Sequence, residues 1–271
     1  MQRIDQSLIT PIFVKESDDM PWPEHRVFYL LTGDNIYICR NDRYFRSCVP
    51  ARLWPTELAR HVASLVPKYP LIPQEIIERI CGFFGHMSDL HGAEAIVLLA
   101  WDNGHQQVRT IVPEQVAAVS QGSWGTPHPI GVKYKFPHDL PRDWDVFCDI
   151  HSHCEMAAYA SHTDVEDEDT LNGLHIVVGR LHQEPPEFHA EAVVDGTRFA
   201  IAPPKVIAGY QERSSFPSEW LEQATVTNLK KYRDFSFESD AAPAITGPNN
   251  GDRDKQREER HEEPHDSDHE P

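Results

Sequence analysis

The chain contains few cysteines, and their arrangement excludes two common uses of this residue. Its 271 residues include five cysteines, an odd number, and no two are spaced as Cys-x-x-Cys. An odd count without that spacing argues against a disulfide framework and against a zinc ribbon. We therefore expect a reducing, cytoplasmic compartment.

Targeting segments and basic surfaces are also missing. The start, MQRIDQSLITPIFVKESDD, lacks the basic and apolar regions of a signal peptide, and no run of eighteen apolar residues occurs. We therefore expect no association with a membrane. The formal net charge is -18 and no basic patch is evident, so we expect no binding to nucleic acid through phosphate neutralisation.

Composition and clustered prolines divide the chain into four parts. These are a small α+β module (residues 1–72), a main domain (73–210), a partly helical extension (211–238) and a disordered acidic tail (239–271). The prolines of KYPLIP mark the first boundary, because clustered prolines stop helices. The tail holds ten acidic against four basic residues and lacks aromatics, so it cannot bury enough apolar surface to fold.

The amino-terminal module combines predicted strands with one predicted helix. Aromatic and β-branched residues favour strands at Arg26–Leu31, Asn35–Arg40 and Tyr44–Val49. A helix is predicted over Pro55–Val66, with Thr56 as its cap. The residues of this module do not indicate a chemical function.

The main domain is expected to have an α+β fold, a mixed β-sheet flanked by helices. Apolar residues at helical spacing follow Pro73, and the apolar run Ala95–Trp101 predicts a buried strand. Further strands are predicted in VRTIVPEQVA, DVFCDIHSH and LHIVVGRL, and a hairpin in HAEAVVDGTRFAI with Asp195-Gly196 at its turn. Residues 121–143, rich in proline and glycine, are predicted to form a long loop.

Two histidines at the end of a predicted strand are the strongest chemical signal. His151 and His153 are two residues apart, so their imidazoles point to one face of the strand and can approach one ion. Asp164, at the start of a short predicted helix, would supply a third ligand. Such a set can hold zinc and leave a position open for water, as catalytic zinc sites do. Ser152, between the histidines, adds a hydroxyl that could face whatever the metal activates.

Two further residues complete the candidate site. Ser161 and Asp164 also fit a helix-capping signature, and the roles of cap and ligand are not exclusive. Glu94 starts a buried strand, where a carboxylate is costly without a partner or a purpose. A carboxylate beside the ligands can move a proton from water to a leaving amine. The alternative to this catalytic role is that Glu94 is an ordinary glutamate at the end of a strand, with its carboxylate in solvent.

Glu94, the pair His151 and His153, and Ser161 with Asp164 together resemble the JAMM motif of the MPN+ zinc metalloproteases, over about half of the chain. The resemblance implies an MPN/JAB-like fold with a cytidine-deaminase-like core. It implies that the histidines and Asp164 hold Zn²⁺, that Glu94 is the general acid and base, and that Ser161 steadies the oxyanion. Such enzymes often remove ubiquitin or ubiquitin-like proteins from lysines.

The chain is similar to a narrower bacterial family as well. The runs VPEQV, DIHSHCEMAAYASHTDVEDED and LHIVVGRL resemble the protein A family of the PRTRC systems, a plasmid and mobile-element gene set. This similarity also takes in the amino-terminal module. These systems include a ThiF-like, E1-like protein, so the resemblance implies that this protein is a partner. It also implies that the substrate is a protein or peptide, such as a ubiquitin-like protein.

One departure from the family pattern leaves two interpretations open. Cys154 follows the second histidine, where many members have proline. A thiolate there could occupy the open zinc position and silence the site, or Cys154 could be a passive loop residue. The alternative to an enzyme is an MPN-fold scaffold or binding subunit of a PRTRC complex, which keeps the metal and does little chemistry.

Overall fold

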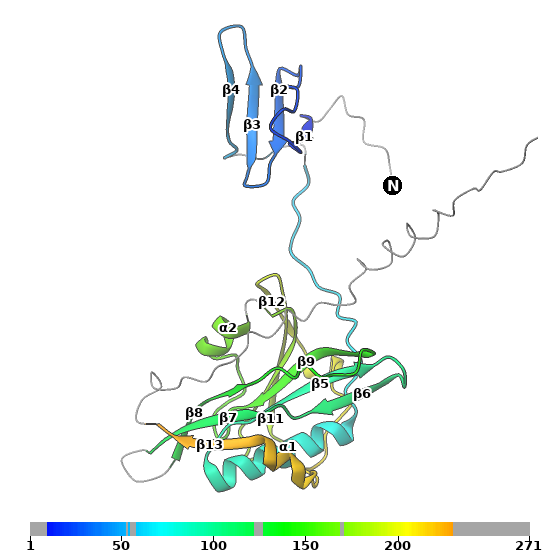
Figure 1. Ribbon diagram of the computed structural model, residues 1–271, viewed down its shortest axis with the longest axis vertical. Coiled ribbons are helices and arrows are strands. Elements are labelled where there is room, and N and C mark those ends of the chain that lie inside the picture. The colour runs from blue at the N-terminus through cyan, green and yellow to red at the C-terminus, as the bar shows by residue number, and fades with distance from the viewer. Residues whose placement is uncertain (1–9, 53, 55–57, 122–126, 169–170, 230–271) are drawn as a thin grey trace, which may run out of the picture. The chain divides into compact units, whose positions relative to one another are not determined.

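The computed structural model describes residues 10–52, 54, 58–121, 127–168 and 171–229. The chain divides into two compact units, Met1–Ser64 and Leu65–Pro271 (Figure 1). The division lies eight residues before the predicted boundary, because Leu65 and Tyr69 pack against the core of the second unit. The predicted acidic tail over residues 239–271 lies outside the described residues.

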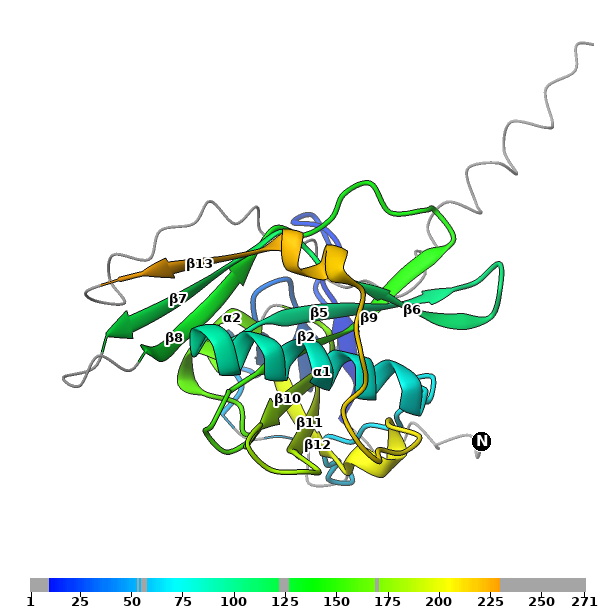
Figure 2. The ribbon, with the colours of Figure 1, turned by 90° about the horizontal axis from the view of Figure 1, so that it is seen from below.

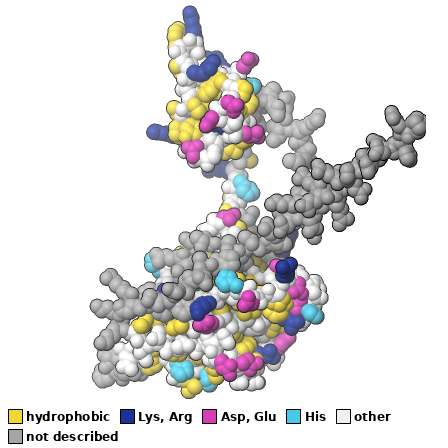
Figure 3. All heavy atoms as spheres, viewed as in Figure 1, with side chains coloured by type: hydrophobic (Ala, Val, Ile, Leu, Met, Phe, Trp, Pro, Cys, Tyr) yellow, Lys and Arg dark blue, Asp and Glu magenta, His cyan; other side chains and the backbone are white. Residues whose placement is uncertain are grey.

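The first unit contains a four-stranded sheet in the order β1-β2-β3-β4. Its strands are Ile12–Val14, Val27–Leu31, Ile36–Asn41 and Arg46–Pro50. The three predicted strands are confirmed, and β1 adds a parallel partner to β2. A small core forms around Phe28, Leu30 and Cys39. Apolar side chains also gather on the surface of this unit, as Figure 3 shows, among them Tyr44 and Phe45.

The helix predicted over Pro55–Val66 is wrong where the chain is described, because residues 58–66 contain no helix. Val62 and Val66 are 80% and 79% exposed. An isolated helix of fewer than about 12–15 residues is marginal in water unless an apolar face packs on a partner. Val62 and Val66 lack such packing, and every described helix or strand of the first unit is a strand, so the described part of this unit is all β rather than α+β.

The second unit has a mixed α+β fold built mostly from strands. Its larger sheet has the order β12-β11-β10-β9-β5-β6. In that order the strands are Thr197–Ile201, Glu187–Val194, Gly173–Gly179, Trp144–Ser152, Ile96–Asp102 and Gln107–Ile111. β9 and β10 pair in parallel, whereas the other neighbours are antiparallel. A smaller sheet has the order β13-β7-β8, with strands Ala224–Asn228, Gln115–Gln121 and Pro127–Tyr134.

The long helix α1, Gln74–His91, packs against the larger sheet (Figure 2). Its apolar side chains, including Ile77, Ile80 and Phe84, form a single hydrophobic core together with buried residues of β5, β9 and β10. Gly92 ends the helix in the left-handed conformation, at φ 59°, which glycine adopts at little cost. The predicted helix after Pro73 is therefore confirmed. Within the described ranges, the other helices are α2, His162–Glu168, and two short 3₁₀ turns at Pro203–Lys205 and Ser218–Gln223.

Several predicted elements of this unit need correction. The single strand predicted over VRTIVPEQVA is two strands, β6 and β7, in two different sheets, with Pro113 between them. Residues 121–143 are not a continuous loop, since β8 pairs with β7. Within the predicted helical extension, β13 pairs in parallel with β7. Among the described residues, no helix is long and apolar enough to cross a membrane.

Candidate metal centre

The two candidate histidines lie at the end of a central strand. β9 runs between β5 and β10 in the larger sheet and carries His151 as its penultimate residue. His153 follows the strand, and both imidazoles are buried. Alternation along the strand sends both rings to the same face. Asp164 reaches this face from α2, so the structure brings the three predicted ligands together.

The spacing of the ligand atoms is that of a metal site. The Nε2 atoms of His151 and His153 are 3.3 Å apart. Asp164 places one carboxylate oxygen 3.5 Å from Nε2 of His151 and the other 3.3 Å from Nε2 of His153. Tetrahedral zinc with bonds of about 2.0–2.1 Å has ligand atoms about 3.3–3.4 Å apart. These separations are similar, and one ligand atom from each side chain lies within 4.8 Å of the others, so the three side chains could hold one ion.

The charges at this face favour a cation. Burial alone would raise the pKa of Asp164, but the imidazoles of His151 and His153 outweigh it and hold that pKa well below its ordinary value. Burial alone would lower the pKa of His151, but the carboxylates of Asp149 and Asp164 raise it well above its ordinary value. A divalent cation can replace the protons that these groups attract.

The capping signature is present and orients the third ligand. The backbone N–H of Ser161 donates to Oδ2 of Asp164 at 2.6 Å, and the N–H of Asp164 donates to Oγ of Ser161 at 3.3 Å. These reciprocal bonds form a capping box at the first turn of α2. Oδ2 of Asp164 is also the oxygen that lies near His153, so the cap sets the direction of the carboxylate.

Glu94 is buried beside the ligand set rather than exposed to solvent. It lies two residues before β5, and Ile96 of β5 pairs with His151. Burial raises the pKa of Glu94 to about 7, although the nearby imidazoles of His153 and His151 oppose the shift. One pocket of about 290 Å³ is lined by both candidate groups, Glu94 and Ser161, together with the three ligands. Residues 129–134 of β8 form part of the pocket lining, a strand that the sequence did not predict.

The serine between the histidines has a different role from the expected one. Ser152 is fully buried, because its side chain points to the opposite face of β9 from its neighbours. Its Oγ accepts a hydrogen bond from the N–H of Ala95 at 3.0 Å, and its own N–H donates to the carbonyl of Ala95 at 3.0 Å. The expectation that Ser152 faces the metal is therefore wrong, and Ser152 instead joins β9 to the segment that carries Glu94.

Cys154 has the features of a passive residue. Its backbone has a positive φ of 48°, and its side chain is buried. Burial raises the pKa of the Cys154 thiol to about 12. It does not contribute to the lining of the pocket. These observations favour the passive interpretation over a thiolate that blocks the metal.

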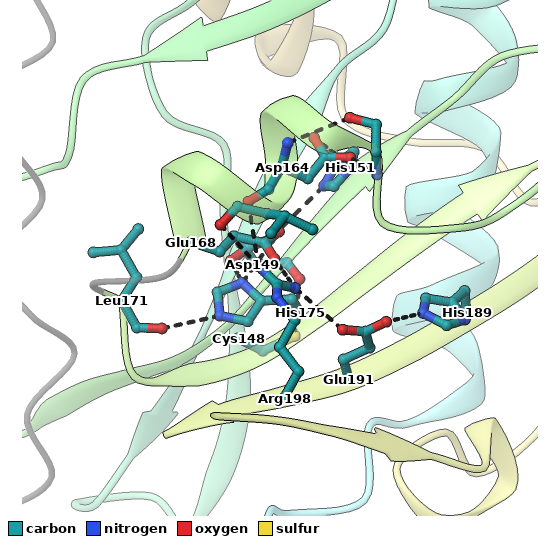
Figure 4. A network of polar contacts seen from close by, with 12 residues as sticks. Cys148, Asp149, His151, Asp164, Glu168, Leu171, His175, His189, Glu191 and Arg198 are labelled. Atoms are coloured by element: carbon teal, nitrogen blue, oxygen red, sulfur yellow. Dashed lines mark hydrogen bonds and ion pairs between the residues drawn. The ribbon is translucent and has the colours of Figure 1, made fainter. Parts of the chain in front are cut away.

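A second cluster of buried polar side chains lies next to the candidate ligands, and the sequence did not predict it. Asp149, Glu168 and His175 place potential ligand atoms within 4.8 Å of one another, and Arg198 joins them through Glu168 (Figure 4). Burial alone would lower the pKa of His175, but Asp149 and Glu168 raise it to about 9. The position of Asp149, two residues before His151 on the same strand, was the available signal.

No protein-family model matches the chain. The search of curated proteins finds no match either.

Proposed function

We propose that the second unit is a zinc-dependent hydrolase of the JAMM/MPN+ type, which cleaves a peptide or isopeptide bond. The observation that carries the proposal is the convergence of Glu94, Ser161 and the three-ligand face on one pocket. These residues come from three separate segments of the chain. The mixed six-stranded sheet, with α1 packed against it, supports an MPN/JAB-like fold with a cytidine-deaminase-like core.

His151, His153 and Asp164 would hold the ion. Their spacing suits a tetrahedral ion, and two imidazoles favour zinc over Mg²⁺ and Ca²⁺, which prefer oxygen ligands. Bound zinc supplies Lewis acidity, which polarises a carbonyl and lowers the pKa of water to about 7. With three protein ligands, a fourth position is available for the chemistry.

Glu94 would carry the proton. Its pKa of about 7 suits a group that must accept and release a proton near neutral pH. The attacking water loses a proton to the Glu94 carboxylate as its oxygen bonds to the substrate carbonyl carbon. When the C–N bond breaks, Glu94 returns the proton to the departing amine nitrogen. Burial in the pocket wall keeps bulk water from competing for that proton.

Ser161 would stabilise the oxyanion. Its Oγ accepts a hydrogen bond from the N–H of Asp164, and a serine hydroxyl can donate one hydrogen bond while it accepts others. The hydroxyl hydrogen is therefore available for an oxygen that gains negative charge in the pocket. The capping box fixes the position of this donor before the substrate arrives.

The proposed substrate class is a protein or peptide, with a ubiquitin-like protein as the leading case. The motif resemblance and the similarity to the PRTRC protein A family support it, and they also support a ThiF-like, E1-like partner. Partly exposed apolar side chains at the edge of the pocket, Met156 and Tyr159, offer contacts to a peptide chain.

The test is the metal content and the activity of the purified full chain. We expect about one zinc per chain and cleavage of a ubiquitin-like protein fused to a reporter through its carboxyl terminus. His151→Ala should lose the metal, whereas Glu94→Gln should keep the metal and lose turnover. His91→Ala, which changes an exposed histidine at the end of α1, should keep both and is the matched control.

Two results would contradict the proposal in different ways. A wild-type chain without stoichiometric divalent metal would contradict the metal centre itself. A chain that binds zinc but cleaves nothing, even with candidate partners added, would instead favour a scaffold or binding subunit.

A further inference from the structure

The short helix that carries Asp164 is held by one arginine from another part of the chain. Arg198 lies on β12. Its Nη2 donates to the backbone carbonyls of Val165 at 3.2 Å and Asp164 at 3.5 Å. Its Nη1 donates to Oε2 of Glu168, the last residue of α2, at 2.9 Å. One guanidinium therefore contacts both the first and the last turn of the helix.

α2 depends on such contacts because it is short. It has seven residues, and helices much shorter than about 12 residues are not stable by themselves in water. The capping box fixes its first turn from within. The contacts of Arg198 with Val165 and Glu168 instead tie the body of the helix to the sheet.

Arg198 is itself held in place from the sheet. Its Nη1 also donates to Oε2 of Glu191 on β11 at 3.1 Å, and Glu191 is bound by His189 at 2.5 Å. Arg198 is only 19% exposed at its side chain. A guanidinium is planar and always charged, and can serve several acceptors at once, which the single ammonium group of lysine cannot reproduce.

The same network continues to the candidate ligand His151 (Figure 4). Nδ1 of His175 lies 3.5 Å from Oε1 of Glu168 and 2.5 Å from Oδ2 of Asp149. The other oxygen of Asp149 lies 3.9 Å from Nδ1 of His151, the ring nitrogen that faces away from the ligand face. The network thus contacts the helix of one ligand and the imidazole of another.

We infer that Arg198 is a positioning residue of the metal centre, which holds α2 against the sheet so that Asp164 completes the ligand set with His151 and His153. It does not line the pocket and acts through the helix. The inference rests on the proposed function, because it assigns Arg198 a role in metal binding.

The experiment uses the full chain with Arg198→Met and the milder Arg198→Lys. Hydrogen exchange of the metal-free protein reports on α2, in particular on the amide of Val165, which donates to the carbonyl of Ser161 at 3.0 Å. Competition with a chelator gives the zinc affinity. Arg180→Met is the matched control, because Arg180 forms an Arg–Glu pair with Glu187 at 3.1 Å on the surface.

We expect faster exchange in α2 and a zinc affinity lower by about 10–100-fold for Arg198→Met, the range seen when groups that orient metal ligands are removed. Arg198→Lys should show a smaller loss in the same direction, and Arg180→Met neither change. If Arg198→Met does not fold, the lysine variant decides the question by the same two measurements.

Unchanged α2 exchange together with unchanged zinc affinity in a folded Arg198 variant would overturn the inference. A wild-type chain that binds no zinc would contradict the proposed function, and with it the role of Arg198 in metal binding. Faster α2 exchange with unchanged zinc affinity would leave Arg198 a purely structural residue, which also overturns the inference.

Discussion

The hydroxyl of Ser152 accepts a hydrogen bond from the backbone N–H of Ala95 at 3.0 Å, across 57 residues of sequence. The two neighbours of Ser152 are candidate metal ligands, and the residue before Ala95 is the candidate proton carrier, Glu94. The N–H of Ser152 also donates a hydrogen bond to the carbonyl of Ala95, so two hydrogen bonds connect these residues. The distance between the ligands and Glu94 is thus set by a contact on the opposite face of the strand.

Loss of the Ser152 hydroxyl should destabilise the second unit. In Ser152→Ala the N–H of Ala95 remains buried but loses its side-chain acceptor, which costs about 1–3 kcal/mol of unfolding free energy. Chemical denaturation measures this cost. Ser215→Ala, at an exposed serine, is the control, and equal stability of the two variants would show that the bond contributes nothing.

Cys154 should not affect the metal. Its buried side chain does not line the pocket that holds the candidate ligands, so we expect Cys154→Ala to bind zinc with unchanged affinity and to retain whatever activity the wild type has. Zinc competition and turnover provide the measurement, with Cys48→Ala, an exposed cysteine of the first unit, as control. A clear gain of activity in Cys154→Ala would instead indicate a thiolate that blocks the open position.

Gly179 at the end of β10 permits the loop beside the pocket to approach the sheet. A Cβ at this position would lie 2.4 Å from the backbone nitrogen of Ala158 and 2.5 Å from the carbonyl oxygen of Met156. Gly179→Ala must therefore displace backbone, and we expect a loss of about 1–3 kcal/mol, as for other overpacked sites.

Thermal denaturation with hydrogen exchange over residues 155–160 tests the effect of Gly179→Ala. Gly33→Ala is the control, since nothing lies within 4 Å of a Cβ there. A Gly179→Ala variant as stable as wild type, with unchanged exchange in the loop, would contradict the prediction.

Asp102, the last residue of β5, should make the second unit sensitive to acid. Burial alone would raise the pKa of Asp102, but the N–H of His105 and the guanidinium of Arg109 hold it at about 2, below its ordinary 3.8. Since the folded pKa is the lower one, the ionised carboxylate stabilises the fold above about pH 4, and this stability is lost as the pH falls toward 2.

Asp102→Asn should therefore remove part of the loss of stability between about pH 4 and pH 2. The test is to compare the urea denaturation midpoints of Asp102→Asn and the wild type across that pH interval. Asp139→Asn, at an exposed aspartate, should keep the slope of the wild type. An identical pH dependence in Asp102→Asn and wild type would count against the assignment.

Elements with strong local patterns were predictable from the sequence. The stripe of Ile77, Ile80 and Phe84 predicted α1, which buries those side chains. Asp195 and Gly196, with φ values of 48° and 71°, form the two-residue turn that joins β11 to β12, as Asp-Gly pairs commonly do. These predictions succeed because the residues involved lie within a few positions of one another.

Elements that depend on a distant partner were not predictable. β8 and β13 are strands because they pair with β7, and the residues of β8, which include two prolines and a glycine, carry no clear alternation. The deciding interaction for both strands lies elsewhere in the chain. The segment after Trp54 has the apolar content of a helix, but Val62 and Val66 are exposed and residues 58–66 contain no helix.

For the candidate site, the sequence by itself determined that His151 and His153 share a face, because side chains alternate along a strand, and that Ser161 caps the helix of Asp164, because a cap is a local bond. Only the tertiary structure decided that Ser152 faces Ala95, that Glu94 lies beside the ligands, and that Arg198 holds α2. These three depend on strand pairing and on packing between segments far apart in the chain. No short stretch of sequence contains both partners of such a contact.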